Sequence, residues 1–163
     1  MSKDITSPGK GAKQTEVALF KMLWMRSNKR SFISGLHLRQ YQGTEMWYSC
    51  FAHVLSKAQN KYPHFRFLAA NLVILDPIEH HYFDNGSEEQ RIAYSLDLEQ
   101  KTKGKGTADW SKLKAREEEL KKLYGKHFPS TFSGILNYRY SPDEVIKVVG
   151  ELNKQFFEAL DKN

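Results

Sequence analysis

The segment Asn71-Leu72-Val73-Ile74-Leu75-Asp76-Pro77-Ile78-Glu79-His80-His81 joins an apolar run to a strong helix start. The run from Leu72 to Leu75 is typical of a short buried strand. Asp76 is a favourable N-cap, Pro77 suits the first helical position, and Glu79 completes a capping box. The segment therefore predicts a strand that leads directly into a helix beginning at Pro77.

This helix is expected to be short. Asn85-Gly86 supplies residue types that tolerate the left-handed conformation at a helix end, so the helix should end near Asp84. His80 and Asp84 are four residues apart and therefore share one face of the helix. Two such side chains on one face can hold one cation.

Extended structure is expected in the region from residue 31 to residue 75. His53 lies in the apolar run Cys50-Phe51-Ala52-His53-Val54-Leu55, which is typical of a strand. The extended candidates, separated by Gly43, Asn60 and Pro63, are Phe32-Ile33, Met46 to Leu55 and Phe65 to Leu75.

Helical spacing and capping residues predict further helices. They are expected from Glu16 to Met25, from the Ser87 capping box to about Leu98, from a cap at Asp109 or Ser111 to Gly125, and from the Ser141 capping box through Leu160. Residues 1–15 are polar and Gly-rich, which favours a disordered basic tail. Residues 16–163 then form a single domain.

The order His53, Asn71, His80 resembles the motif of the HNH endonuclease family. These ββα-metal nucleases include phage recombination endonucleases and colicin-type DNases. The interval from Asn71 to His80 is nine residues (80 − 71), as is usual in that family, and the resemblance covers roughly residues 31–86. It implies an α+β fold: a ββα-metal core over about 31–86, flanked by an N-terminal helix and by a helical extension over about 87–163.

The resemblance also implies an activity and a role for each residue. The chain would be a metal-dependent endonuclease that hydrolyses DNA phosphodiester bonds. His53 would be the general base, a role that suits a side chain titrating near pH 6.5. Asn71 would fix the loop that orients this base, while His80 and Asp84 would hold one divalent cation, Mg²⁺, Mn²⁺ or Zn²⁺.

Two positions depart from the family pattern. Many members carry a metal-binding Asp or His directly before the base, where this chain has Ala52, so the resemblance implies only two protein ligands. An Asp at position 52 would then be expected to supply a third. Many members also have two Cys-x-x-Cys pairs, which would fall at Ser31 to Gly35 and at Asp76 to Glu79. With one cysteine, Cys50, the chain cannot form a structural Cys₄ zinc site.

Charge and composition favour a nucleic-acid partner. The chain has 25 Lys+Arg against 19 Asp+Glu, a formal charge of +6, which attracts polyanions such as DNA. The sequence contains no apolar run of about 18 residues, so no membrane span is expected. One cysteine fits a reducing cytoplasm, here that of a bacterial or phage-infected cell. The residues expected to contact DNA are Lys57, Lys61, Arg66, His81, Lys101, Lys103 and Lys105.

Two other functions fit the same sequence. Ala52 is compatible with a catalytically inactive HNH-fold protein that still binds DNA. The chain would instead be a structural or interaction protein if the motif match is accidental. In that case Asp84 would cap the turn ahead of Asn85-Gly86, and the basic loop from Lys101 to Lys105 would be a solvated surface.

Overall fold

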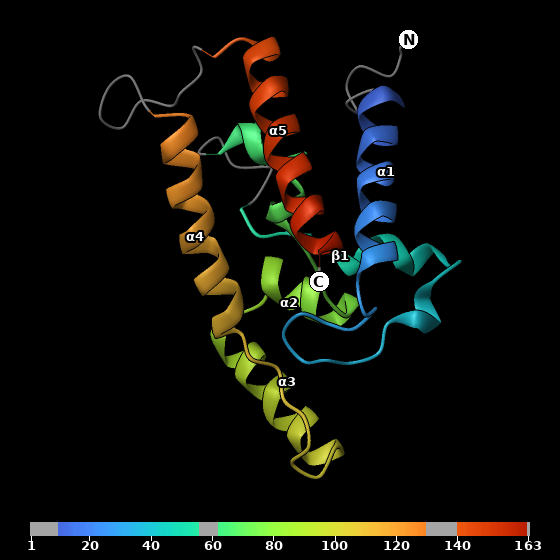
Figure 1. The fold of residues 1–163 in the computed structure, drawn as a ribbon. Coiled ribbons are helices and arrows are strands. Elements are labelled where there is room, and N and C mark those ends of the chain that lie inside the picture. Colours follow the sequence, from blue (N-terminus) through green and yellow to red (C-terminus); the bar gives the residue numbers. More distant parts are fainter. Residues whose placement is uncertain (1–9, 56–61, 130–139, 163) are drawn as a thin grey trace.

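The structure, a computed structural model, describes residues 10–55, 62–129 and 140–162, and the side chains among these from residue 16 onward. It has an α+β fold in which helices surround a small sheet (Figure 1). The helices are α1 (Lys10–Arg26), α2 (Pro77–Asn85), α3 (Glu88–Lys101), α4 (Ser111–His127) and α5 (Pro142–Asp161).

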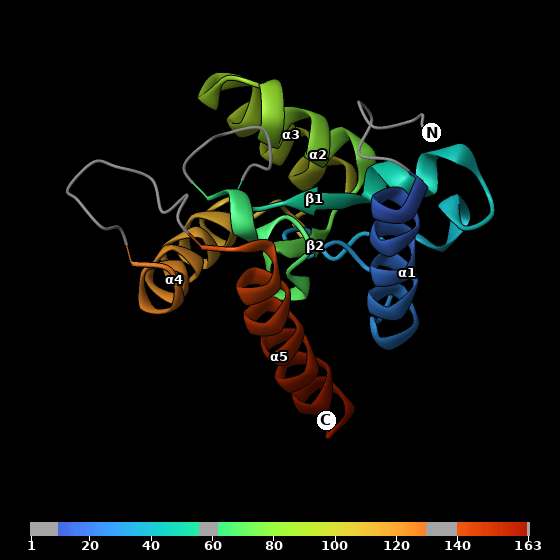
Figure 2. The same cartoon turned by 90° about the horizontal axis from the view of Figure 1, so that it is seen from above.

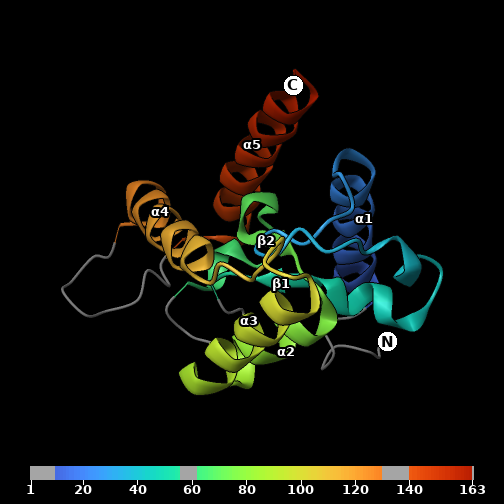
Figure 3. The same cartoon turned by 90° about the horizontal axis from the view of Figure 1, so that it is seen from below.

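The sheet consists of two short antiparallel strands, β1 (Phe51–His53) and β2 (Leu72–Ile74). The pairs are Phe51 with Ile74, Ala52 with Val73, and His53 with Leu72. In Figures 2 and 3, α1 and α5 lie to one side of the two strands and α2 and α3 lie to the other. Because α2 follows β2 directly, the chain places two strands and a helix in succession.

The two faces of the sheet contribute to two apolar cores. Strand residues alternate between faces, so Phe51 and Leu72 pack with residues of α1, whereas Ala52 and Val73 pack with residues of α4 and the N-terminal half of α5. Phe51 stacks on Phe20 of α1, with ring centroids 4.3 Å apart. One core thus holds α1 against one face of the sheet, and the other holds α4 and the start of α5 against the opposite face.

The strands are shorter than the sequence patterns predict. Phe32-Ile33 forms turns, and the segment expected to extend from Met46 is instead a 3₁₀ helix (Glu45–Cys50) that precedes β1. Trp47 and Cys50 are both buried and lie three residues apart, which is the repeat of a 3₁₀ helix. Further 3₁₀ turns at Pro63–Phe65 and Ala69–Asn71 replace the start of the third extended candidate, Phe65 to Leu75.

The predicted capping boxes at Asp76, Ser87 and Ser141 are all present. Gly86 has φ −85°, so it does not adopt the expected left-handed conformation. It is required for another reason, because a Cβ there would lie 2.7 Å from the carbonyl oxygen of Tyr82.

Three helices extend beyond their predicted bounds. The helix α3 continues past Leu98 to Lys101, so Lys101 lies in a helix and not in the expected basic loop. The helix α4 continues past Gly125 to His127, since the next residue, Phe128, is buried in the core. The helix α1 begins at Lys10, within the segment expected to be a disordered tail; residues 12–14 (Ala-Lys-Gln) are good helix formers. Among the described residues, no helix has both the length and the apolar character needed to cross a membrane.

Candidate functional site

Asn71 is a fully buried polar residue that ties together three backbone groups. Its amide oxygen accepts a hydrogen bond from the Leu55 N–H (2.7 Å), and its amide nitrogen donates to the carbonyl oxygens of Leu55 (3.0 Å) and Phe65 (3.1 Å). A buried amide must satisfy its donors and acceptor in this way. Asn71 therefore fixes the backbone just after β1 to the backbone just before Arg66.

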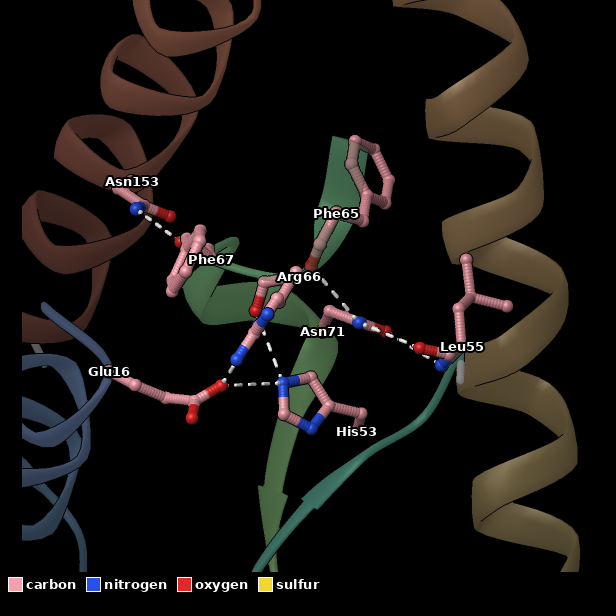
Figure 4. A network of polar contacts seen from close by, with 8 residues as sticks. All are labelled: Glu16, His53, Leu55, Phe65, Arg66, Phe67, Asn71 and Asn153. Carbon is pink, nitrogen blue, oxygen red and sulfur yellow. Dashed lines mark hydrogen bonds and ion pairs between the residues drawn. The ribbon is translucent and has the colours of Figure 1, made fainter. Parts of the chain in front are cut away.

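His53 lies beside this fixed loop, on the face of the sheet that α1 covers (Figure 4). Its Nε2 is 3.1 Å from the carbonyl oxygen of Arg66 and 3.6 Å from a carboxylate oxygen of Glu16 on α1. Both neighbours are acceptors, so Nε2 carries the hydrogen and donates it. In the neutral ring Nδ1 then holds the lone pair, and Figure 4 shows Nδ1 turned away from Glu16 and Arg66.

Glu16 and Arg66 complete this polar cluster. The Arg66 Nε lies 3.5 Å from the Glu16 carboxylate, and the Glu16 and His53 side chains are only 13% and 11% exposed. Asn153 of α5 binds the same loop, donating to the Phe67 carbonyl (2.9 Å) and accepting from the Ala69 N–H (2.7 Å). The ring of His53 is thus oriented by groups from α1 and from a loop that α5 braces.

His80 and Asp84 form a second polar pair, on α2. The His80 Nε2 lies 3.0 Å from the Asp84 Oδ2, and the His80 Nδ1 lies 2.7 Å from the carbonyl oxygen of Ser49. A metal-ligating histidine usually donates its other N–H to such a carbonyl. Neighbouring ligands of an octahedral ion with bonds of about 2.1 Å are about 3 Å apart, so the separation of these two atoms fits a shared cation.

The polar cluster around His53 and the His80–Asp84 pair are separate groups. Across residues 16–55, 62–129 and 140–162, no three His, Cys, Asp or Glu side chains gather closely enough to hold one ion. Ala52 is fully buried among apolar side chains. The structure therefore brings His80 together with Asp84, and His53 together with Glu16 and Arg66, but His53 does not join the pair on α2.

The segments Ser31 to Gly35 and Asp76 to Glu79 meet in space and are joined by a hydrogen-bond network. The buried Glu79 accepts from the Ser31 hydroxyl (2.5 Å), the Tyr94 hydroxyl (2.9 Å) and the Asp76 N–H (3.0 Å). Burial, together with the nearby charge of Glu79, raises the pKa of Tyr94. Asp76 caps α2 and accepts from Tyr41. The two segments are thus joined by a network of hydrogen bonds.

The residues expected to contact DNA fall in different surroundings. Lys57 and Lys61 lie outside the described residues. Arg66 contacts Glu16, Lys101 pairs with Asp97 (2.9 Å), and the His81 ring lies beside Tyr82. Lys103 is exposed, and Lys105 lines a cleft at the edge of β2.

Glu16 is the site residue that the sequence patterns did not single out. Helical spacing placed it only at the start of an amphipathic segment. It is, however, the only acidic residue between Asp4 and Glu45, in a segment rich in Lys and Arg. An isolated carboxylate in such a segment is the signal that could have drawn attention to it.

Comparisons with protein-family models, curated proteins and solved structures gave no match to this chain.

Proposed function

We propose that the chain is a metal-dependent endonuclease of the HNH, ββα-metal type that hydrolyses DNA phosphodiester bonds. The observation that carries this proposal is the orientation of His53. Its Nε2 faces the Arg66 carbonyl and the Glu16 carboxylate, both of them acceptors, so Nδ1 is the basic atom of the neutral ring. A base held in one orientation by a carbonyl and a carboxylate is a recurrent arrangement for proton abstraction.

In the proposed reaction, Nδ1 of His53 takes a proton from a water molecule, and the resulting hydroxide attacks phosphorus. The P–O bond to the leaving oxygen breaks with its electron pair, and that oxygen later gains a proton from solvent. Glu16 stabilises the imidazolium that forms on His53, because a negative charge lies 3.6 Å from its Nε2. Asn71 contributes by holding the loop whose Arg66 carbonyl orients the ring.

His80 and Asp84 are the residues that would hold the divalent cation. The fit rests on their 3.0 Å separation and on the Ser49 carbonyl that orients the His80 ring. The Asp84 side chain is 48% exposed, which leaves room for phosphate and water as further ligands. When bound, a divalent cation supplies positive charge that stabilises the phosphate and the leaving oxygen.

Nicking of supercoiled plasmid in the presence of Mg²⁺, Mn²⁺ or Zn²⁺ tests the proposal. His53→Ala should lower the rate by about 10²- to 10⁴-fold, the usual contribution of a positioned base. His37→Ala is the matched control, since His37 is exposed and lies outside both polar groups. Thermal melting of each variant verifies the fold. Cleavage by His53→Ala at the rate of the His37→Ala control would refute the assignment.

A catalytically inactive DNA-binding protein is the second candidate. Ala52 favours it, because this fully buried position offers no carboxylate beside the base. Salt-sensitive DNA binding without nicking in any of the three metals would support this function over the first.

A further inference from the structure

A cleft of about 700 Å³ runs along β2, on the side of the chain where α1, α4 and α5 converge. Its walls come from the C-terminal turns of α1 and α5, the first turns of α4, and the segments around residues 26–35 and 105–109. Five cationic side chains line it, against one acidic side chain, Asp109. The cationic residues are Arg26, Arg30, Lys105, Lys112 and Arg116.

Three of these cations are not neutralised by a neighbouring carboxylate. Arg26 pairs with Asp161 at 2.7 Å, and Arg116 pairs with Glu119 at 3.8 Å while its guanidinium lies over the Phe32 ring at 4.9 Å. By contrast, the exposed Arg30, Lys105 and Lys112 have no carboxylate within 4 Å in the described part of the chain. Positive charge is therefore concentrated in this cleft.

The single acid of the cleft can offset only one of these positive charges. One carboxylate oxygen of Asp109 accepts hydrogen bonds from the hydroxyl (2.5 Å) and the N–H (3.2 Å) of Ser111, at the start of α4. Asp109 is thus engaged with the adjacent helix start. The three uncompensated cations come from two segments far apart in the sequence, so the fold itself creates the cluster.

We propose that this basic cleft binds the sugar–phosphate backbone of DNA. A run of phosphates matches several cations spread along a groove better than a single anion does, and arginine and lysine are the usual phosphate contacts. The proposal rests on the proposed function for its choice of DNA as the polyanion, but it concerns binding and not cleavage.

The cleft follows β2 through Leu72, Val73 and Ile74. Leu72 is the direct partner of His53 across the two strands. A backbone that lies along the cleft is therefore beside the strand that pairs with the strand of His53.

The test measures the binding of a fluorescein-labelled DNA duplex by anisotropy, with the full chain and in EDTA so that no cleavage occurs. One variant combines Arg30→Gln, Lys105→Gln and Lys112→Gln. The matched control combines Lys122→Gln, Lys126→Gln and Lys147→Gln, which removes the same charge from exposed positions outside the cleft.

The cleft variant should bind DNA about 10-fold or more weakly than the wild type. The magnitude of the slope of log K against log salt should fall by about 2–3, as expected for the loss of two or three phosphate contacts. The control should lose less than about threefold.

Equal losses in the two variants would mean that net charge alone attracts DNA, and would overturn the proposal. If the triple cleft variant does not fold, the double variant Lys105→Gln with Lys112→Gln takes its place, because both side chains are exposed. Selective loss of binding in the cleft variant supports the proposal even if His53→Ala still nicks plasmid. Normal binding by the cleft variant overturns it even if the wild type proves to be a nuclease.

Discussion

Ser31 and Glu79 lie 48 positions apart in the chain, yet the Ser31 hydroxyl donates a 2.5 Å hydrogen bond to the buried Glu79 carboxylate. This bond joins the turn after α1 to the first turn of α2. Tyr94 of α3 donates to the second oxygen of the same carboxylate. One buried side chain therefore connects three segments around α2.

Replacing Glu79 should destabilise the protein strongly. Glu79→Ala leaves the hydroxyls of Ser31 and Tyr94 without their acceptor, and we expect the free energy of unfolding to fall by about 3–5 kcal/mol. Glu79→Gln keeps an acceptor oxygen and should cost less. Urea denaturation measures the loss of unfolding free energy in both Glu79 variants. The control is Glu89→Ala, at an exposed position in the first turn of α3, which should cost under about 1 kcal/mol. A loss no greater than the control would show that the network does not stabilise α2.

The buried thiol of Cys50 should make stability fall in alkali. Burial raises its pKa to about 12 from an ordinary value near 9, and the charges of Asp76 and Glu79 add to this effect. Between these values only the unfolded chain loses the proton, so the folded state binds more protons and its stability falls as pH rises. Cys50 should therefore account for a loss of about 1 kcal/mol between pH 8 and pH 10.

Urea denaturation of the wild type and of Cys50→Ala at both pH values checks this. The variant should lose less stability than the wild type over this interval. Tyr94 and Tyr41, whose pKa values burial also raises, add a similar loss above about pH 10 in both proteins. Identical pH dependence for the two proteins would exclude the thiol as the cause.

Local signals predicted the starts of α2, α3 and α5, but not those of α1, which begins at Lys10, or of α4, whose N-cap is Trp110. The capping boxes at Asp76, Ser87 and Ser141 each depend on residues three apart, so the sequence contains the whole interaction. The strand lengths were not predictable in this way. Trp47 and Cys50 adopt a 3₁₀ helix because α1 provides the core against which both pack, and this partner lies more than twenty residues away in the chain.

In the candidate site, too, local spacing predicts some contacts, whereas others depend on tertiary packing. The spacing of His80 and Asp84 placed both on one helical face, and they lie 3.0 Å apart in the structure. Glu16 reaches His53 from a different helix, and the Asn71 side chain binds backbone atoms of Leu55 and Phe65. Such contacts depend on tertiary packing, which no local spacing encodes.

Glu16 is expected to act as a positioning residue for His53. Glu16→Gln removes the charge beside Nε2 with little change in volume, so the rate of plasmid nicking at saturating DNA should fall about 10-fold while the DNA concentration for half-maximal rate stays unchanged. Glu16→Asp should restore part of the rate. Glu45→Gln, at an exposed position, serves as the control. A change in DNA affinity without a change in maximal rate would contradict the role.

Cation binding should depend on His80 more than on its neighbour. His80→Ala removes the nitrogen that lies 3.0 Å from Asp84, whereas His81 is exposed and has its ring beside Tyr82. Calorimetric titration with Mn²⁺ should show weaker binding for His80→Ala and near-normal binding for His81→Ala. A larger loss of Mn²⁺ affinity for His81→Ala would show that the cation binds at a different face of α2.

The burial of Ala52 determines what a carboxylate at that position would do. Ala52 is fully buried and packs among apolar residues, with Val73 opposite it in the sheet. Ala52→Asp would place a charge there without a hydrogen-bonding partner, so we expect the free energy of unfolding to fall by about 3–5 kcal/mol. The metal dependence of nicking should not shift to lower concentration. Ala115→Asp on the exposed face of α4 is the control and should cost little. If Ala52→Asp instead kept its stability and bound the cation more tightly, position 52 would face the cation, and the introduced carboxylate would be the third ligand that the family pattern implies.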